Sequence, residues 1–417
     1  MIRIERVLLI AIMTEKDEND RFIYSLEELK ALAKTADGMV VHTLTQKRIN
    51  PHPATYVGEG KLEEIKAICV EEEIDVVIAN HELSGGQIRN LQDYLEVRII
   101  DRSQLILDIF AARAQTREGK LQVELAQYAY MLPRLRGQGT DLSRLGAGIG
   151  TRGPGETKLE TDRRHIQRRM DELKYQLKSV VNQREQYRSK RRKNHLLQIA
   201  IVGYTNAGKS TIFNALTRSE SLQEDKLFAT LDPLTRKLRL PKGLELILTD
   251  TVGFIQDLPT SLIAAFRSTL EEVKEADVIL HVIDVAAPDK EDHEETVLQQ
   301  LKELEASEIP VLTIYNKKDL IDSDDFIPHS HPYYLMSARN EADLLQLKEK
   351  IEAFLSEQMQ PYQCLIPESE SRTLNRLKKH SIIDELVYQE VTEGYLVKGF
   401  VDQSHPIMRE IKEFQQQ

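Results

Sequence analysis

Short apolar runs alternate with amphipathic helical stretches in the first part of the chain. Four runs have the length of a strand: Arg3–Met13, Gly38–Thr45, Asp75–Asn80 and Val97–Asp101. Two segments between them, Ser25–Thr35 and Lys61–Glu73, carry apolar residues at helical spacing. Strands that alternate with helices predict a small α/β domain, which we place at residues 1–112.

A pattern with a longer period follows. The polar stretch Thr157–Lys193 carries apolar residues seven, four, three, four and three positions apart: Leu159, Ile166, Met170, Leu173, Leu177 and Val180. This spacing is typical of the seam of a two-helix coiled coil. Another helical stretch, Lys120–Leu132, precedes it, and a run with seven glycines separates the two. We predict an antiparallel helical hairpin with a glycine-rich tip over residues 113–195.

The alternation of strands and helices returns at Leu196 and continues to Gln360. Five apolar runs predict strands: Gln198–Val202, Leu244–Thr249, Val278–Val285, Val311–Tyr315 and Tyr333–Met336. Helices are expected between them, for instance at Ser261–Lys274 and His293–Ala306. This order favours a mostly parallel sheet with helices on both faces over residues 196–360.

The last segment, residues 361–417, predicts a small α+β module. Its expected elements are, in chain order, a strand, a basic helix, the two strands of a hairpin and a final helix: Gln363–Ile366, Arg372–His380, Asp384–Val391, Gly394–Val401 and Ile407–Phe414. The turn of the hairpin is placed at Glu393–Gly394.

Composition narrows the class of protein. The length of 417 residues suggests roughly two to four domains, and an apolar fraction of 41% allows a sizeable core. Cys69 and Cys364 stand far apart, which favours a reduced, cytoplasmic protein over a disulfide framework or a metal cluster. The apolar N-terminal run lacks a cleavage site, and no run is long enough to cross a bilayer. A net charge of −11 argues against a wholly basic nucleic-acid-binding protein.

A glycine-rich loop between a predicted strand and the predicted helix Thr211–Arg218 is the first candidate site. It matches G-x-x-x-x-G-K-[ST] over Gly203, Tyr204, Thr205, Asn206, Ala207, Gly208, Lys209 and Ser210. Backbone N–H groups of such a loop meet the N-terminus of the helix, where partial positive charge stabilises phosphate. Lys209 is expected to reach the β- and γ-phosphates, and the Ser210 hydroxyl is expected to ligate Mg²⁺.

A second motif, D-x-x-G, follows the predicted strand Leu244–Thr249 with Asp250, Thr251, Val252 and Gly253. Asp250 is expected to hold Mg²⁺ through water, and Gly253 to offer its amide to the γ-phosphate. In Ras-like enzymes the next residue is a glutamine that orients the attacking water, whereas here it is Phe254. We therefore predict slow hydrolysis by the protein alone and activation by a macromolecular partner.

A third motif, N-K-x-D, follows the strand at Val311–Tyr315 with Asn316, Lys317, Lys318 and Asp319. A carboxylate that accepts from N1–H and the exocyclic amine selects guanine, because adenine lacks this donor pair. Asn316 is expected to tie the base loop to the phosphate loop, and the Lys317 stem to cover the base. Ser337 and Ala338, followed by Arg339, complete a backbone cradle for the guanine oxygen. These motifs stand at the carboxyl ends of strands, where open α/β sheets bind ligands.

Between the first two motifs lie Phe228, Ala229, Thr230, Leu231 and Asp232. This segment resembles the first switch of translation-type GTPases, in which a threonine completes the magnesium shell. By that resemblance Thr230 joins Ser210 and Asp250 as a residue of the metal site; the alternative is a threonine in a turn. We assign Lys209, Thr230 and Gly253 to catalysis.

The predicted hairpin is basic although the whole chain is acidic. From Glu156 to Lys193 there are thirteen basic and six acidic residues, a net charge of +7. The glycine-rich tip carries four more arginines: Arg134, Arg136, Arg144 and Arg152. Such a loop can approach a nucleic-acid backbone, and RNA recognition favours phosphate contacts on irregular surfaces. A solvated coiled-coil face and a flexible linker are the alternatives.

The segment Arg152–Ile166, RGPGETKLETDRRHI, lies directly upstream of GYTNAGKST, FATLD and DTVGF. Together these segments resemble the HflX family of ribosome-associated GTPases, and the turn Tyr56–Lys61 fits as well. Lys158 departs from the pattern, because the family often has glutamine there. The resemblance covers nearly the whole chain.

This resemblance implies a GTPase with Mg²⁺ as cofactor that binds GTP or GDP and the large ribosomal subunit. The hairpin tip would reach toward the peptidyl-transferase region. The implied activity is the splitting or rescue of stalled or stress-inactivated ribosomes, with hydrolysis stimulated by the ribosome. The free protein is expected to be monomeric.

Two other functions stay open. A ribosome-assembly GTPase would use the hairpin to bind immature ribosomal RNA, and GTP would time its release. A nucleotide-dependent RNA remodeller would work through the first domain, and members of the family are credited with ATP binding or hydrolysis. The sequence of the first domain shows no second phosphate loop, which weighs against that activity here.

Overall fold

The structure is a computed structural model that describes residues 4–15, 17–135, 154–193, 195–217, 228, 233–254, 272–322 and 326–415. Three expectations fall outside these residues: most of the glycine-rich tip, most of the helix predicted at Ser261–Lys274, and the segment Ala229–Asp232. Arg134, expected in the tip, is instead the last residue of a helix and pairs with Glu82 and Asp101. The described residues form two compact units. The first holds those up to Asn182 together with Phe228, and the second holds the others.

The first unit contains a four-stranded, wholly parallel sheet in the order β2-β1-β3-β4. Its strands are β1 (Arg6–Met13), β2 (Met39–Lys47), β3 (Val76–Ala79) and β4 (Arg98–Asp101). Its helices are α1 (Asn19–Thr35), α2 (Glu59–Glu71), α3 (Gly85–Leu95) and α4 (Arg102–Arg113). The central strand β1 is buried along its length, as the continuous apolar run in the sequence requires for a strand covered on both faces.

Two helices of this unit were not predicted from the apolar pattern. Helix α3 begins with a capping box, in which the Ser84 hydroxyl accepts from Gln87 N and the Gln87 side chain accepts from Ser84 N. Helix α4 is capped by Asp101, whose carboxylate accepts from Gln104 N. Both helices therefore start at local hydrogen-bonding signals that periodicity alone does not reveal.

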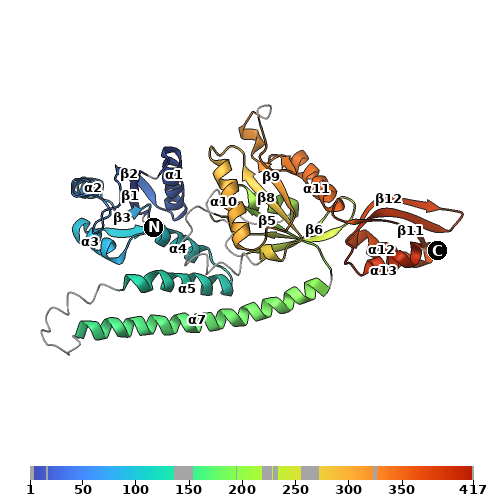
Figure 1. Cartoon of the computed structure of the whole chain (residues 1–417), viewed down its shortest axis with the longest axis horizontal. Helices are drawn as coiled ribbons and strands as arrows, with labels where there is room; N and C mark the ends of the chain where they lie inside the picture. The colour runs from blue at the N-terminus through green and yellow to red at the C-terminus, as the bar shows by residue number, and fades with distance from the viewer. Residues whose placement is uncertain are drawn as a thin grey trace. The chain divides into compact units, whose positions relative to one another are not determined.

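Two long helices, α5 (Arg117–Arg134) and α7 (Pro154–Lys193), follow, and they lie side by side (Figure 1). An ion pair of 2.9 Å between Arg169 of α7 and Glu124 of α5 joins them. Ile166, Met170 and Leu173 of the predicted seam are buried. The hairpin architecture is thus confirmed for the described residues, and α7 begins at Pro154, where proline is favoured in a first helical turn.

The second unit contains a six-stranded sheet in the order β10-β9-β8-β5-β7-β6. Its strands are β5 (Gln198–Gly203), β6 (Leu234–Arg239), β7 (Glu245–Asp250), β8 (Val278–Asp284), β9 (Val311–Asn316) and β10 (Tyr333–Leu335). All five predicted strands are confirmed and run parallel, whereas the edge strand β6 is antiparallel to β7 and was not predicted.

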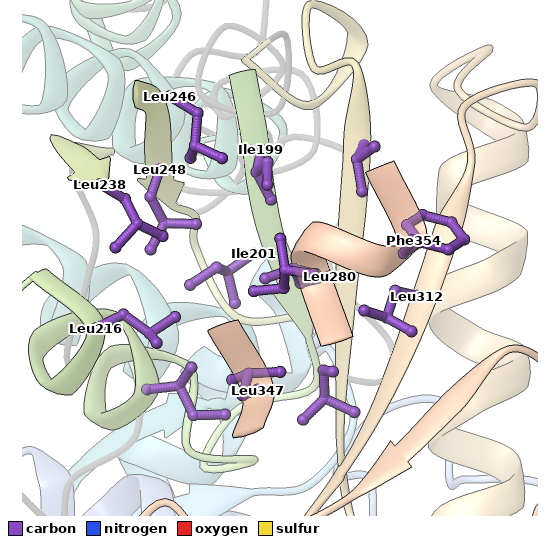
Figure 2. Close-up of a cluster of buried hydrophobic side chains, with 14 of the residues drawn as sticks. Ile199, Ile201, Leu216, Leu238, Leu246, Leu248, Leu280, Leu312, Leu347 and Phe354 are labelled. Carbon is purple, nitrogen blue, oxygen red and sulfur yellow. The ribbon is translucent and has the colours of Figure 1, made fainter. Parts of the chain in front are cut away.

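Helices cover both faces of this sheet. Helices α8 (Lys209–Thr217) and α11 (Glu341–Ser356) pack on one face, where Leu216, Leu347 and neighbouring strand residues form a buried apolar cluster (Figure 2). Helix α10 (Lys290–Glu303) packs on the other face through Val297 and Leu301. The predicted fold class, a mostly parallel sheet between helical layers, is confirmed.

The C-terminal part of the second unit forms a three-stranded antiparallel sheet in the order β11-β13-β12. Its elements are β11 (Gln360–Pro367), α12 (Ser371–His380), β12 (Ile382–Gln389), β13 (Gly394–Val401) and α13 (Ile407–Gln415). The two helices cover one face, where Leu377 and Ile411 pack with Val397. Every element expected in this module is present. No helix among the described residues is long and apolar enough to cross a membrane.

Candidate nucleotide-binding site

The glycine-rich loop joins the end of β5 to the start of α8, as the phosphate-binding motif requires. Gly203 and Gly208 have φ angles of +152° and +97°, a backbone region that side chains rarely adopt. A Cβ atom on Gly208 would lie 2.2 Å from Asn316 Nδ2, and one on Gly203 would lie 2.2 Å from the Val282 carbonyl oxygen. Both glycines are therefore required by conformation and by space.

Lys209, the first residue of α8, is buried, and its ammonium donates to the Tyr204 carbonyl at 2.6 Å. Burial lowers the pKa of Lys209 to about 8, while the nearby carboxylate of Asp250 opposes this shift. A phosphate group beside the ammonium would favour its charged form in the same way. The loop thus holds a buried lysine ammonium with little access to water, and an anion such as phosphate would stabilise its charge.

The D-x-x-G segment is fastened to the phosphate loop by backbone hydrogen bonds. Phe254 N donates to the Gly203 carbonyl at 3.1 Å, and Thr205 N donates to the Phe254 carbonyl at 2.7 Å. A Cβ on Gly253 would lie 2.9 Å from Lys209 Nζ, so this glycine stands directly against the lysine. The structure therefore brings Lys209 and Gly253, two of the three residues assigned to catalysis, into contact range.

Phe254 occupies the position of the water-orienting glutamine in Ras-like enzymes. Its side chain is 1% exposed and packs with Val202 and Ile279 in the cluster beneath α10. The aromatic ring serves as an apolar anchor for the start of this loop. Phe254 supplies no polar group to a nucleophile, which agrees with the expectation from its chemistry.

Two acceptor residues of this site fit a hard cation. The Asp250 carboxylate, at the carboxyl end of β7, is fully buried, and Ser210 lies in the first turn of α8. Carboxylate and hydroxyl oxygens are ligands that Mg²⁺ prefers. The neighbouring Thr251 hydroxyl donates to the Ile201 carbonyl at 2.7 Å, so it is hydrogen-bonded to strand β5. The third predicted metal residue, Thr230, lies outside the described residues.

The N-K-x-D segment follows β9 and is tied to the phosphate loop. Asn316 Nδ2 donates to the Ala207 carbonyl at 2.9 Å, and Asn316 Oδ1 accepts from Ala338 N at 2.9 Å. One buried side chain thus connects the phosphate loop with the loop after β10. This is the connection that the sequence assigned to Asn316.

Asp319 lies in the short 3-10 helix η1 (Lys318–Leu320). Its carboxylate accepts from the Ser337 hydroxyl at 2.6 Å, and this hydrogen bond lowers the pKa of Asp319. Arg339 N donates to the Ser337 hydroxyl at 3.3 Å, and Lys318 N donates to the Met336 carbonyl at 3.1 Å. An ionised carboxylate held in place by a neighbour can accept two N–H groups from a purine edge.

Two residues that support the base loop were missed by sequence reasoning. Asp284, at the end of β8, pairs with Lys317 Nζ at 2.6 Å and also accepts from Ala286 N at 3.0 Å. Asp343 in α11 accepts from Ser337 N at 2.8 Å. An acidic residue at the end of a strand was the available signal for Asp284, but its pairing depends on β8 lying beside β9.

A buried histidine supports the phosphate loop from the side of α10. The rings of His293 and Tyr204 are stacked, with centroids 3.7 Å apart and an interplanar angle of 12°. Burial lowers the pKa of His293 to about 4 and the pKa of His281 on β8 to about 3, the latter with a contribution from Lys209. Both imidazoles are neutral near pH 7, so they add no positive charge to the loop.

The first-switch segment is described only at Phe228. Phe228 is buried, and its ring lies edge-on to Phe110 of α4 with centroids 4.5 Å apart. Ala229, Thr230, Leu231 and Asp232 lie outside the described residues. Contact of this segment with nucleotide and metal therefore stays a prediction.

A phosphate loop, a D-x-x-G segment and an N-K-x-D segment meet at the carboxyl edge of a mostly parallel sheet. This combination defines a P-loop GTPase. Three family models match consecutive parts of the chain: GTP-binding GTPase N-terminal at residues 24–111, GTP-binding GTPase middle region at 113–191, and 50S ribosome-binding GTPase at 198–317. The chain belongs to the HflX family of ribosome-associated GTPases.

Curated relatives named GTPase HflX match nearly the full chain. The relative from Alkalihalophilus pseudofirmus is 54% identical over 98% of this chain and 97% of its own. The relative from Escherichia coli is 41% identical over 91% of this chain and 90% of its own. Among solved structures, the complex of SsGBP with GDP has a TM-score of 0.50 and 26% identity, over 84% of this chain and 97% of that chain. The protein is therefore a GTPase that hydrolyses GTP.

Proposed function

We propose that this GTPase binds the large ribosomal subunit and splits or rescues stalled or stress-inactivated ribosomes in the cytoplasm. Support comes from a basic two-helix hairpin encoded directly before the GTPase motifs. The match to a family model described as 50S ribosome-binding GTPase points to the same partner. We further propose that residues 1–112, 113–195, 196–360 and 361–417 act as four modules.

In the proposed site the loop amides and Lys209 bind the phosphates, and Asp319 accepts from the guanine edge. Mg²⁺, held by Ser210 and Asp250 with Thr230, would neutralise charge on the β- and γ-phosphates. Gly253 stands against Lys209, and its amide would bond to the γ-phosphate. Binding of GTP would then order the segments around Thr230 and Gly253, and hydrolysis would release them.

The single observation that carries ribosome-stimulated hydrolysis is the burial of Phe254. Its ring is in the core beneath α10, so the position that orients water in Ras-like enzymes offers no hydrogen bond. The proposed intrinsic rate is therefore low. A group supplied by the ribosome would raise the rate by about 10³–10⁵-fold, the range known for groups supplied in trans.

Sucrose-gradient centrifugation tests the splitting activity. Intact ribosomes are incubated with the protein and GTP, GDP or a non-hydrolysable GTP analogue, and the subunits are separated by sedimentation. Splitting with GTP and with the analogue, but not with GDP, supports the proposal. Ribosomes that stay intact while immature subunits bind the protein would instead favour an assembly GTPase. Equal binding to large subunits with GDP and the analogue would defeat the nucleotide switch.

A further inference from the structure

Strand β12 forms an open edge of the C-terminal sheet and carries unusually exposed apolar side chains. Leu386, Val387 and Tyr388 are 38%, 44% and 44% exposed, and Val391 just beyond the strand is 98% exposed. Among the residues that the structure describes, β12 pairs only with β13. Free backbone groups along such an edge are a template for another strand.

The apolar side chains of this edge lie on both faces of the sheet. Val387 is opposite Leu396, which in turn is opposite Leu365, on the face that α12 and α13 leave open. Leu386 is opposite Val397, on the face that the two helices cover. An added strand would therefore find apolar neighbours for alternate side chains on either side.

The residues around the C-terminal end of β12 are acidic. Glu368 and Glu370 in the short helix η3 (Glu368–Glu370), and Glu390 and Glu393 in the turn after β12, are all exposed. Within the described part of the chain these four carboxylates form no ion pair. Nearer the start of β12, by contrast, Glu385 pairs with Lys398 of β13 at 2.7 Å.

We propose that the outer edge of β12 binds an extended, lysine- or arginine-rich protein segment as an additional antiparallel or parallel strand. The acidic groups would attract the basic side chains, and Leu386, Val387 and Tyr388 would contact the apolar residues between them. RNA does not fit this surface, because its phosphates would meet the four carboxylates. A second copy paired in parallel does not fit either, because its acidic turn would lie beside the same turn of the first copy.

This binding site goes beyond the proposed function and does not depend on it. The test uses the full chain with GDP and a fluorescein-labelled decapeptide of alternating lysine and valine. Fluorescence anisotropy measures the affinity, and hydrogen exchange locates the amides that the peptide protects. A decapeptide of alternating glutamate and valine, and a decauridine RNA added as competitor, probe the charge and the class of the occupant.

The variant Glu390→Gln/Glu393→Gln removes two charges from the turn, and Glu71→Gln/Glu73→Gln removes two exposed charges elsewhere on the chain. The first pair is expected to weaken peptide binding about tenfold, because it removes two of the charges that attract the basic peptide. The second pair is expected to leave it unchanged. Val387→Ser tests the apolar contact and should weaken binding without altering the charge.

Protection of the amides at 384–391 by the basic peptide, together with unchanged basal GTP turnover in the variants, is the expected result. The proposal is overturned by equal binding of the acidic peptide, or by equal losses in the two charge variants. Protection confined to other segments, displacement of the peptide by decauridine, or β12 protected in a self-dimer without peptide would overturn it as well.

Discussion

The described residues form a wholly parallel sheet in the first unit and a mostly parallel sheet in the second, and of these two the second alone has a phosphate loop at its carboxyl edge. In the second unit, β5 ends in a glycine loop that leads into the N-terminus of α8 and has positive φ angles at Gly203 and Gly208. In the first unit, side chains fill the corresponding edge between β1 and β3. The Tyr56 hydroxyl accepts from Ile12 N at 3.1 Å and is 2.6 Å from His81 Nδ1.

Next to Tyr56 and His81, a second group of buried side chains fills the carboxyl edge of the first sheet. Arg102 pairs with Glu28, and Asn80 after β3 accepts from the Arg102 guanidinium at 3.3 Å. Arg102, Glu28 and Asn80 thus hold one another at this edge, whereas the second unit has a glycine loop at the corresponding place. A parallel sheet thus becomes a nucleotide site through the conformation of its loops and not through its topology. We expect nucleotide binding in the second unit only.

The largest effect is expected from Lys209→Ala, which removes the buried ammonium from the phosphate loop. Ribosome-stimulated GTP turnover should fall by at least about 10²–10³-fold, the range for loss of one group that stabilises the transition state. Turnover assays on the variant and on Lys274→Ala, which removes an exposed lysine paired with Glu305, provide the comparison. RNA remodelling that survives Lys209→Ala would shift the activity to the first unit.

Tyr56→Phe probes the packed edge of the first sheet. The change leaves the buried Ile12 N without its acceptor, so the free energy of unfolding should fall by about 1–3 kcal/mol. Urea unfolding followed by circular dichroism measures this loss. Affinity for GDP, measured in parallel, should stay the same. A clear loss of GDP affinity would contradict the division of roles between the two sheets.

The buried histidines of the second unit predict a stability that depends on pH. The pKa of His281 is lowered to about 3 in the folded state, so below its ordinary value near 6.5 the unfolded chain binds a proton that the folded chain does not. The contribution of His281 to the free energy of unfolding is therefore fully present above pH 6.5 and is lost as the pH falls toward 3. At pH 5 the loss from this residue is about 2 kcal/mol.

Urea unfolding at pH 7 and pH 5 measures this dependence, and His281→Gln should reduce it by the contribution of one group. His293→Gln should act in the same direction, because the pKa of His293 is lowered to about 4. An unchanged difference between the two pH values in both variants would show that these imidazoles are charged in the fold.

Asp284→Asn should give the smallest effect. The change removes the charge that holds Lys317 over the expected position of the base. Because both side chains are partly exposed, the loss is about 1 kcal/mol, or roughly fivefold in GDP affinity. Isothermal titration calorimetry measures it, with Asp322→Asn in a nearby loop as a control of equal charge. Equal affinities of wild type and Asp284→Asn would show that Lys317 does not contact the base.

Some residues of the site could be predicted from the sequence, and others could not. Glycines at Gly203 and Gly208 could be recognised from sequence because local backbone geometry demands them. The partners Asp284 and Asp343 could not, because their contacts arise only when distant elements pack together. The burial of the Phe254 ring belongs to the same category, since it depends on the cluster beneath α10.

The helices and strands likewise divide into those that the sequence predicted and those that it did not. The positions of the central strands β1 and β5 followed from continuous apolar runs, because strands buried on both faces need them. The exposed edge strand β6 escaped prediction, since its outward positions are polar and its pairing with β7 is a tertiary contact. Helix α1 begins at Asn19 instead of Ser25, because its first turn is polar.

We propose that Asp319 selects guanine in a site whose phosphate loop is built around Lys209. Isothermal titration calorimetry with GDP and ADP, on the wild type and on Asp319→Asn, tests it directly. We expect the wild type to bind GDP at least about 100-fold more tightly than ADP, and the variant to lose most of this preference. Equal affinity of the wild-type protein for GDP and ADP would contradict it.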